Sequence, residues 1–268
     1  GSSHVAIFAP GQTGPSAVLD FTQCCAAALA FDVAGTLYVA TTGDGIAVFP
    51  PGATTPSRRL RGGGTALAID AAGDLAAGGA DRDRNVHVYP AGGEAGAYAI
   101  PSRVSAGGLA FAPNGELAVA DGSATVSVYA PGAASPSRTV AVTPETNLVR
   151  FDAGGHLVAA STTLAVITLF APAANVRTVE VKGLRPESLA FDSDGRLLVG
   201  LPFGVQPITP QQRPVKRLSG PAADALAADS NGTFAAGDTA RGLVLIYAGD
   251  TRTVLGGLDG VRGLAFSP

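Results

Sequence analysis

The chain has 268 residues, of which 36 are glycine and 19 are proline, and only 15% are charged. With 18 basic and 21 acidic residues it has no polyelectrolyte face, which argues against nucleic acid as a partner. No apolar run is long enough to span a bilayer and no signal peptide is evident, so we expect no membrane partner. Gly1-Ser2 resembles a cloning remnant in place of a native leader, so the sequence leaves the localisation open and favours a secreted or extracytoplasmic protein.

The first predicted elements are two strands near the N-terminus. Residues 4–11 align with residues 126–132 of a later repeat, and residues 16–21 follow as the next strand. Apolar side chains alternate at period two throughout the chain, and no window keeps a helical period. These two segments match the third and fourth strands of the repeats that follow.

Six repeats come next, and a turn glycine marks each of them. It occurs, at spacings of 38, 42, 40, 40 and 37 residues, at Gly35, Gly73, Gly115, Gly155, Gly195 and Gly232. A period near 40 that carries several short strands is typical of propeller blades. In the third repeat the expected strands are residues 108–111, 116–120, 125–129 and 137–140.

The last predicted element, residues 263–268, repeats the first strand of a blade. The two ends of the chain thus supply three strands of one more blade, which removes exposed sheet edges. The sequence predicts a single all-β domain, residues 1–268, folded as a seven-bladed β-propeller closed by N- and C-terminal strands in one shared blade. We also expect a monomer. The second strand of that blade is missing, so either the blade has three strands or the chain is cut or rearranged there. A six-bladed ring with redundant ends is the alternative.

Aspartate stands three residues before the turn glycine in five repeats, at Asp32, Asp70, Asp152, Asp192 and Asp229. Its carboxylate can accept backbone N–H groups within the turn, and glycine tolerates the positive φ that the turn needs. We interpret these aspartates as turn formers and not as a catalytic set. The large apolar residues that end the first strands should pack between blades: Phe31, Ile69, Phe111, Phe151, Phe191 and Phe266.

Repeats of the form Leu-Ala-Phe-Asp-x-x-Gly-x-Leu-Tyr-Val-Ala, followed by Val-x-Val-Phe or Val-x-Val-Tyr, resemble the NHL-repeat, SMP-30/gluconolactonase and streptogramin-lyase-like group of propellers. The resemblance covers nearly the whole chain, and its motif encodes blade geometry. Gluconolactonase-like members hold a divalent metal at the channel mouth with Glu, Asn and Asp and hydrolyse lactones. Lyase-like members rely on a histidine and a metal, and NHL modules mostly bind proteins or RNA. The resemblance therefore implies the fold and leaves the activity open.

Two columns of residues should ring the channel mouth, because they immediately precede the first strands. The column eight residues before each turn glycine reads Ala27, Thr65, Gly107, Asn147, Glu187, Asp224 and, by extension, Arg262. The column two residues further upstream reads Cys25, Gly63, Ser105, Glu145, Arg185, Ala222 and Gly260. Since the polar members gather on one side, we predict a lopsided ligand site. Its expected residues are Cys25, Glu145, Asn147, Arg185, Glu187, Asp224 and Arg262.

Asn147, Glu187 and Asp224 supply the hard oxygen ligands that Ca²⁺ or Mg²⁺ takes, so a metal site is one interpretation of this mouth. Arg185 and Arg262 nearby favour two others, a metal-free ring of salt bridges or a site for an organic or charged ligand. Solvated loop residues without a ligand are the fourth.

Cysteine and histidine give little further support for chemistry. The adjacent Cys24 and Cys25 are interpreted as two small buried residues, with a strained vicinal disulfide or redox pair as the alternative. No histidine pair, Ser-His-Asp set or zinc spacing occurs. The arginines of the outermost strands are interpreted as structural: Arg58, Arg138, Arg177, Arg217 and Arg252.

Three functions remain compatible with the sequence. The favoured one is a recognition propeller that binds a small molecule or a protein partner at the channel mouth. The second is a divalent-metal-dependent hydrolase of lactones or esters, in which the metal polarises a carbonyl and lowers the pKa of a bound water. The third is an architectural domain of a longer chain.

Overall fold

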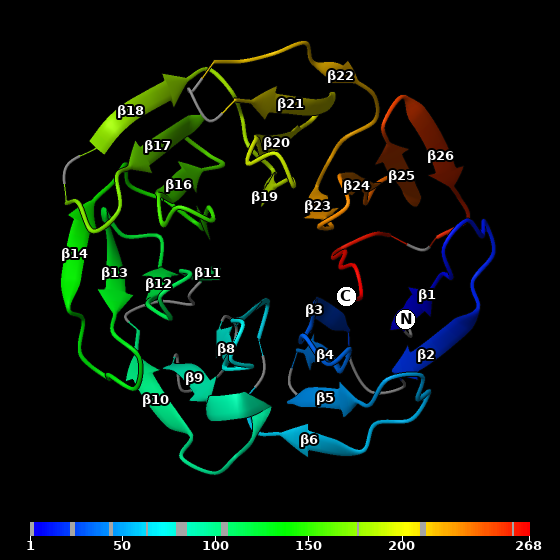
Figure 1. Ribbon diagram of the computed structural model, residues 1–268, viewed down its shortest axis with the longest axis horizontal. Coiled ribbons are helices and arrows are strands. Elements are labelled where there is room, and N and C mark those ends of the chain that lie inside the picture. The colour runs from blue at the N-terminus through cyan, green and yellow to red at the C-terminus, as the bar shows by residue number, and fades with distance from the viewer. Residues whose placement is uncertain are drawn as a thin grey trace.

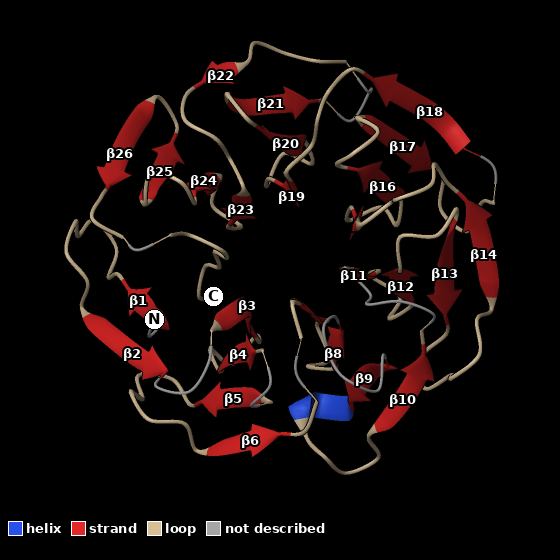
Figure 2. Cartoon of the chain, turned by 180° about the vertical axis from the view of Figure 1, so that it is seen from behind, coloured by secondary structure: helices blue, strands red, loops and turns tan. Residues whose placement is uncertain are grey.

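A computed structural model describes residues 3–21, 25–42, 45–62, 64–78, 85–102, 107–175, 177–209, 213–258 and 260–268. The described chain is an all-β propeller in which six four-stranded sheets stand around a central axis (Figure 1). The only helical element in the described residues is a three-residue 3-10 turn, Pro90–Gly92, which Figure 2 shows in blue. Among these residues no helix is long and apolar enough to cross a membrane.

Every blade is an antiparallel sheet whose strands follow one another in chain order from the axis outwards. The first strands are β3 (Ala26–Phe31), β7 (Ala66–Ile69), β11 (Gly108–Phe111), β15 (Leu148–Phe151), β19 (Ser188–Phe191) and β23 (Ala225–Ala228). The second strands are β4 (Leu37–Thr41), β8 (Leu75–Gly78), β12 (Leu117–Ala120), β16 (Leu157–Ser161), β20 (Leu197–Leu201) and β24 (Thr233–Asp238).

The two outer strands complete each blade. The third strands are β5 (Ile46–Phe49), β9 (Asn85–Tyr89), β13 (Thr125–Tyr129), β17 (Val166–Phe170), β21 (Gly204–Ile208) and β25 (Leu243–Ala248). The fourth strands are β6 (Arg58–Leu60), β10 (Tyr98–Pro101), β14 (Arg138–Ala141), β18 (Arg177–Lys182), β22 (Leu218–Ser219) and β26 (Thr251–Leu255). In the third blade the expected strands agree with the observed ones to within one residue at each end.

The seventh position of the ring does not contain a complete blade. The N-terminal strands β1 (Ser3–Ile7) and β2 (Ala17–Phe21) form a two-stranded sheet beside the first blade. The C-terminal residues 260–268 reach the same part of the ring, nearer to the axis (Figure 1), but are not a strand. The sequence predicts a strand at residues 263–268, and the structure shows that this prediction is wrong. A strand needs a hydrogen-bonded neighbour, and no described segment pairs with these residues as second strands pair with the first strands of the six blades.

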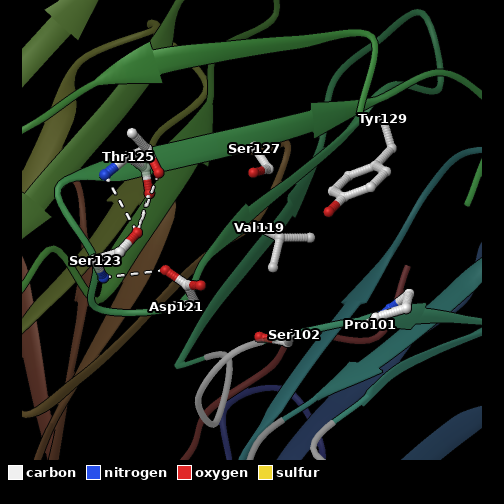
Figure 3. Close-up of a pocket in the computed structure, with 8 residues that line it drawn as sticks. All are labelled: Pro101, Ser102, Val119, Asp121, Ser123, Thr125, Ser127 and Tyr129. Carbon is white, nitrogen blue, oxygen red and sulfur yellow. Dashed lines mark hydrogen bonds between the residues drawn. The ribbon is translucent and has the colours of Figure 1, made fainter. Parts of the chain in front are cut away.

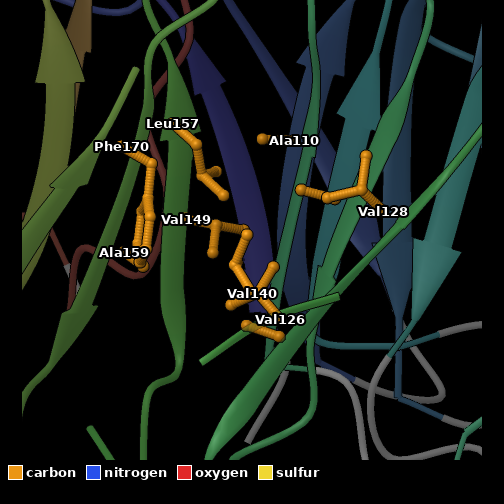
Figure 4. Close-up of a cluster of buried hydrophobic side chains, with 10 residues drawn as sticks. Ala110, Val126, Val128, Val140, Val149, Leu157, Ala159 and Phe170 are labelled. Atoms are coloured by element: carbon orange, nitrogen blue, oxygen red, sulfur yellow. The ribbon is translucent and has the colours of Figure 1, made fainter. Parts of the chain in front are cut away.

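The hydrophobic core is divided among the interfaces between neighbouring sheets. Between the third and fourth blades, Val126, Val128 and Val140 pack against Val149 and Phe170 (Figure 4). A cluster of this kind also joins β2 to the first blade, and another joins the C-terminal segment to the sixth blade. The hydrophobic contacts thus continue around the ring, although the sheet at the seventh position is incomplete.

The large residues at the ends of the first strands lie in these clusters, as expected, but all six are half-buried: Phe31, Ile69, Phe111, Phe151, Phe191 and Phe266. Outer-strand arginines also join blades in two places. Arg58 Nη2 donates to the Gly92 carbonyl at 2.8 Å, and Arg138 Nη1 donates to the Ala174 carbonyl at 3.2 Å. Each bond reaches the turn between the third and fourth strands of the next blade, which confirms a structural role for these two arginines.

The turn aspartates and glycines form the tight turns that the sequence predicts. Asp32 Oδ1 accepts the N–H groups of Ala34 and Thr36 at 2.9 and 2.8 Å. The same pair of hydrogen bonds, from the N–H groups two and four residues later, is found at Asp70, Asp152, Asp192 and Asp229. All six turn glycines have φ between +72° and +86°, a region that other residues rarely adopt. These aspartates are turn formers.

Candidate functional site

The connections between strands divide the molecule into two faces. We call the face that carries the turns from first to second strands, such as residues 112–116, the turn face. The opposite face carries the connections from second to third strands and from one blade to the next, such as residues 121–124 and 142–147, and we call it the loop face. The seven predicted site residues belong to segments of the loop face.

Three of them occupy equivalent positions in successive blades. Asn147, Glu187 and Asp224 each precede a first strand by one residue. Their N–H groups donate to the carbonyls of Ala160, Gly200 and Gly237 at 3.1, 2.8 and 2.8 Å, which extends the ladder between the first and second strands by one pair. The alignment on the turn glycines therefore placed these residues in the right register.

The side chains of Asn147 and Asp224 hold neighbouring loops. Asp224 Oδ2 accepts the N–H of Thr239 at 2.8 Å. Asn147 Oδ1 accepts the N–H of Thr162 at 3.3 Å, and its Nδ2 donates to the Thr162 hydroxyl at 3.1 Å. In both blades the side-chain oxygen accepts the N–H of the residue fifteen positions later, which directly follows the second strand. These oxygens therefore fix the shape of the loop face.

Glu187 cannot make the same hydrogen bond, because the residue fifteen positions later is Pro202, which has no N–H. Its carboxylate lies instead 3.5 Å from Nε of Arg185. The Arg185 side chain is 68% exposed and that of Glu187 is 27% exposed, so water screens this ion pair and it stabilises the fold little. Of these three residues, Glu187 is the one whose side chain makes no hydrogen bond to a neighbouring loop in the described part of the chain.

The remaining predicted residues are not gathered into one cluster with these three by any described interaction. Glu145 is exposed and has φ of +62°, a left-handed conformation that costs a non-glycine residue energy. Arg262 is exposed and has no hydrogen bond or ion pair with the described residues. Cys25 is half-buried, and its carbonyl accepts the N–H of Thr42 at 3.1 Å.

Cys24, Gly63 and Ser105 lie outside the described residues. The two interpretations of the Cys24-Cys25 pair therefore stay predictions, as does the metal at Asn147, Glu187 and Asp224. In the described part of the chain, no group of three or more His, Cys, Asp and Glu side chains lies close enough together to hold a metal ion.

A second set of polar residues, six positions after the turn glycine, was not singled out in the sequence. The side-chain oxygens of Thr41, Asp121, Ser161 and Asp238 each bond within the turn between the second and third strands. The repeated Thr, Asp, Ser and Asp at one offset from the turn glycine was the available signal. The side chains of these residues, too, hydrogen-bond to the backbone of the loop face and hold its shape.

Asp238 is the more buried of the two aspartates in this set, with a side chain that is 1% exposed. Its Oδ1 accepts the N–H of Arg241 and its Oδ2 accepts the N–H of Ala222, while Arg241 Nη1 lies 2.8 Å from Oδ2. Burial alone would raise the pKa of Asp238, but these N–H groups and the guanidinium outweigh it and hold that pKa below its ordinary value.

A hollow of about 360 Å³ opens between the outer strand of the second blade and the third blade (Figure 3). Its lining is mostly hydroxyl groups: Ser102, Ser123, Thr125, Ser127 and Tyr129, with Pro101, Val119 and Asp121. Burial, together with the charge of Asp121, raises the pKa of Tyr129, so its phenol stays protonated at neutral pH. None of its described lining residues is a histidine that could act as a base, and Asp121 accepts the N–H of Ser123 at 3.0 Å. These described residues offer hydrogen bonds to a polar group and include no activated nucleophile.

A wider hollow of about 720 Å³ lies on the turn face, over the turns of the second, third and fourth blades. Its lining includes Asp70, Asn114 and Asp152, whose side-chain oxygens already bond within their turns. None of the seven predicted site residues lines either hollow.

One cation near the axis was also missed. Arg150 stands in the middle of β15, where the other first strands have alanine, at Ala30, Ala68, Ala110, Ala190 and Ala227. Its side chain is half-buried, its Nη1 donates to the Val149 carbonyl at 2.8 Å, and no described carboxylate pairs with it. Removal from bulk water lowers its pKa. The single arginine in a column of alanines was the sequence signal.

Comparison of the sequence with models of known protein families gave no match, and no protein of curated function matched it significantly. The resemblance to the NHL-repeat, SMP-30/gluconolactonase and streptogramin-lyase-like group therefore stays a prediction from the repeat motif.

Proposed function

We propose that the protein is a recognition propeller that binds a protein partner over the part of the loop face that carries Arg185, Glu187 and Arg262. The protein holds the partner without catalysing a reaction on it. The observation that supports this proposal most is that many polar side chains on this face are hydrogen-bonded to the backbone of its own loops. Asn147, Asp224 and the polar residues at the ends of the second strands are hydrogen-bonded to loop backbone, so they give the face a fixed shape.

The groups left for contact are long, exposed and of both charges. Arg185 and Arg241 have side chains that are 68% and 63% exposed, and Arg262 and Glu145 are exposed as well. Since neither described hollow lies among these residues, they suit the rim of a protein interface better than the wall of a small-molecule pocket. A small molecule is the alternative ligand.

A photo-crosslinking amino acid placed at position 185 tests the proposal. The matched control places it at position 194, because Asp194 belongs to the same blade, is 70% exposed and lies on the turn face. We expect the variant at position 185 to form covalent adducts of defined mass with one partner from the native source, and the control to form none. Equal labelling at both positions, or none at either, would contradict a partner on the loop face.

A calcium and magnesium titration separates recognition from the hydrolase alternative. A ligand that binds only the folded protein, at 100 times its Kd, stabilises it by about 2.7 kcal/mol. Recognition without metal predicts no shift of the melting temperature with either ion and no hydrolysis of a δ-lactone. A shift that Glu187→Gln abolishes, accompanied by lactone hydrolysis, would replace the recognition function by the metal-dependent one.

We also propose that the seventh position is a blade shared by the two ends of the chain. In this proposal residues 263–266 are its first strand, and β1 and β2 are its third and fourth strands. The clusters that join β2 to the first blade and the C-terminal segment to the sixth blade support this arrangement.

A further inference from the structure

The third blade packs against the second blade with a face that is apolar in one part and polar in another. Side chains alternate along a strand and Val119 pairs with Ser127, so Val119, Asp121, Ser127 and Tyr129 lie on this one face. Val119 and Tyr129 belong to the apolar cluster between the two blades. Asp121 and Ser127 continue the face toward the loop face, and all four side chains line the hollow of about 360 Å³ (Figure 3).

The hollow has a local cause, because the third blade has a small side chain where the second blade has a large one. Ser127 and His87 occupy the same register position in their blades. A methyl group added at Gly62 would lie 2.7 Å from Cδ2 of His87, so the histidine ring fills the space beside the outer strand of the first blade. Serine has no ring, and the equivalent space between Ser127 and the outer strand of the second blade is left open.

A second difference between these blades concerns the tyrosine that ends the third strand. In the second blade Tyr89 donates its hydroxyl hydrogen bond to the carbonyl of Arg61, directly after the outer strand of the first blade. The strand register places Pro101 of the second blade where Arg61 stands in the first. Tyr129 is only 7% exposed, yet it makes no such bond to the described backbone, and its hydroxyl points into the hollow that Pro101 also lines (Figure 3).

Three polar groups in the hollow keep capacity for further hydrogen bonds. Asp121 Oδ1 accepts the N–H of Ser123, whereas Oδ2 has no partner among the described residues. The Tyr129 hydroxyl has the Ser127 hydroxyl as its hydrogen-bonding neighbour and no other in that part of the chain. The hydroxyls of Ser123 and Thr125 lie 3.1 Å apart and bond to each other. A ligand would therefore meet one carboxylate oxygen and a pair of hydroxyls.

These groups select a ligand by its charge and by the hydrogen bonds that it can make. The described lining includes Asp121 but no lysine, arginine or histidine, so it repels an anion. An ammonium group only donates, and it would leave at least one proton of the Ser127–Tyr129 pair without an acceptor. A ligand hydroxyl both donates and accepts, so several hydroxyls on one ligand satisfy all three groups. A volume of about 360 Å³ is near the lower end of the range for small-molecule sites, which suits one sugar ring.

We propose that the hollow between the second and third blades binds a neutral polyhydroxy molecule the size of one sugar ring. Asp121 Oδ2 accepts hydrogen bonds from ligand hydroxyls, and the hydroxyls of Ser127 and Tyr129 bond to a further ligand oxygen. Val119 gives the C–H groups of the ligand an apolar contact. The ligand is bound and not transformed. This site is separate from the rim on the loop face, and neither proposal depends on the other.

The test titrates ¹⁵N-labelled protein with D-glucose, D-galactose, D-mannose, L-fucose and myo-inositol, each up to its solubility limit. Nuclear magnetic resonance follows the amide signals of residues 119–129. Putrescine and inorganic phosphate are the cationic and anionic probes. We expect at least one neutral probe to cause saturable shifts centred on these residues, and neither charged probe to do so. Binding by none of the neutral probes, or tighter binding of putrescine or phosphate, would overturn the proposal.

Single substitutions locate the binding in the hollow. Ser127→His gives the third blade the side chain that fills the second, and it should abolish binding. Tyr129→Phe and Asp121→Asn each remove one hydrogen-bonding group and should weaken binding at least tenfold, which keeps the test decisive if Ser127→His does not fold. Tyr98→Phe is the matched control, because Tyr98 packs in the same interface but does not line the hollow. Unchanged binding by Tyr129→Phe, or equal weakening by Tyr98→Phe, would overturn the site.

Thermal melting separates a hydroxyl kept for a ligand from one that supports the fold. Tyr89→Phe loses the hydrogen bond to the Arg61 carbonyl, so it should lower the melting temperature. Tyr129→Phe loses no bond to the described backbone, and it should melt at the wild-type temperature or above. An equal fall for both variants would mean that the fold uses the Tyr129 hydroxyl, and it would overturn the assignment of that group to a ligand.

Discussion

In four blades a side chain with an oxygen atom, at or directly after the last residue of the second strand, hydrogen-bonds to the backbone of the loop face. Thr41, Asp121, Ser161 and Asp238 each satisfy a backbone group in the adjoining turn. A buried N–H without a partner costs about 1–3 kcal/mol, so each of these bonds matters even where its net contribution is small. Asp238 shows the effect most clearly, because its carboxylate is buried and its pKa is lowered.

Asp238→Asn should lower the free energy of unfolding at neutral pH by about 1–2 kcal/mol, since the ion pair and part of the N–H bonding are lost. Because the Arg241 side chain is 63% exposed, water screens the ion pair and most of the loss comes from the N–H groups. Urea denaturation measures the change. Asp194→Asn, at an exposed carboxylate, is the control and should leave stability unchanged.

The same variant should change how stability depends on pH. Asp238 has a lower pKa in the folded chain than in the unfolded one, so its contribution is complete above the unfolded pKa of about 3.9 and is lost as the pH falls through the folded pKa. Wild type should therefore lose more stability than Asp238→Asn between about pH 5 and the folded pKa. Parallel pH profiles would contradict the lowered pKa.

Arg150→Met should raise stability. The wild-type guanidinium is partly removed from water with one backbone carbonyl as its described partner, and burying an incompletely paired polar group costs about 1–3 kcal/mol. Methionine keeps much of the volume without the charge, in a column where the other blades have alanine. Thermal melting measures the change, and a lower melting temperature for Arg150→Met would mean that the cation has a partner on which the fold depends.

At the scale of the blade, the interfaces between sheets carry most of the apolar burial. The residue that ends each first strand packs toward the preceding blade but also borders the turn face, where Phe111 and Phe151 line the wide hollow. These rings are therefore less buried than the valines and leucines deeper in the same interfaces.

Phe111→Ala should destabilise the protein by about 2–3 kcal/mol, which is below the range of about 3–5 kcal/mol for a fully buried phenylalanine. The half-buried ring loses fewer neighbours when it is removed. Val33→Ala, at a side chain that is 69% exposed, serves as the control and should change stability little. Denaturant melts of the two variants compare them. A Phe111→Ala variant as stable as Val33→Ala would mean that Phe111 does not pack between blades.

The sequence predicts the blades well because their signals are local. Gly115 needs its positive φ for a turn only four residues long, and the alternation in residues 125–129 directly marks a strand. The partners of the site residues are not local in this sense. Asn147 accepts a hydrogen bond from Thr162 across a whole hairpin, and Pro202 removes the equivalent donor for Glu187. The residue types at the channel mouth therefore could not show which side-chain oxygens already accept hydrogen bonds from the backbone.

The C-terminal strand failed for a different reason. Residues 263–266 have the sequence of a first strand, and Gly263 approaches Leu29 as a first strand should. Strand formation also needs a paired neighbour, which a strand's own sequence cannot supply. The position within the ring was therefore predictable and the hydrogen bonding was not.

At the scale of the whole molecule, both ends of the chain meet between the sixth and first blades. Phe8 from the N-terminal region and Phe266 from the C-terminal region belong to the same cluster as Val244 of the sixth blade. Closure of this kind ties the ends of a long chain together, and the proposed shared blade at the seventh position requires a ring that closes here.

A disulfide between positions 29 and 263 tests this closure most directly. Leu29→Cys and Gly263→Cys are combined with Cys24→Ser and Cys25→Ser, and mass spectrometry of the oxidised protein measures the bridge. Since a methyl group at position 263 would lie 3.7 Å from Cγ of Leu29, we predict an intramolecular disulfide between residues 29 and 263. It should stabilise the ring by about 2–4 kcal/mol, because it constrains the unfolded chain. Two free thiols after oxidation, or bridges formed only between molecules, would contradict the closure of the ring at the seventh position.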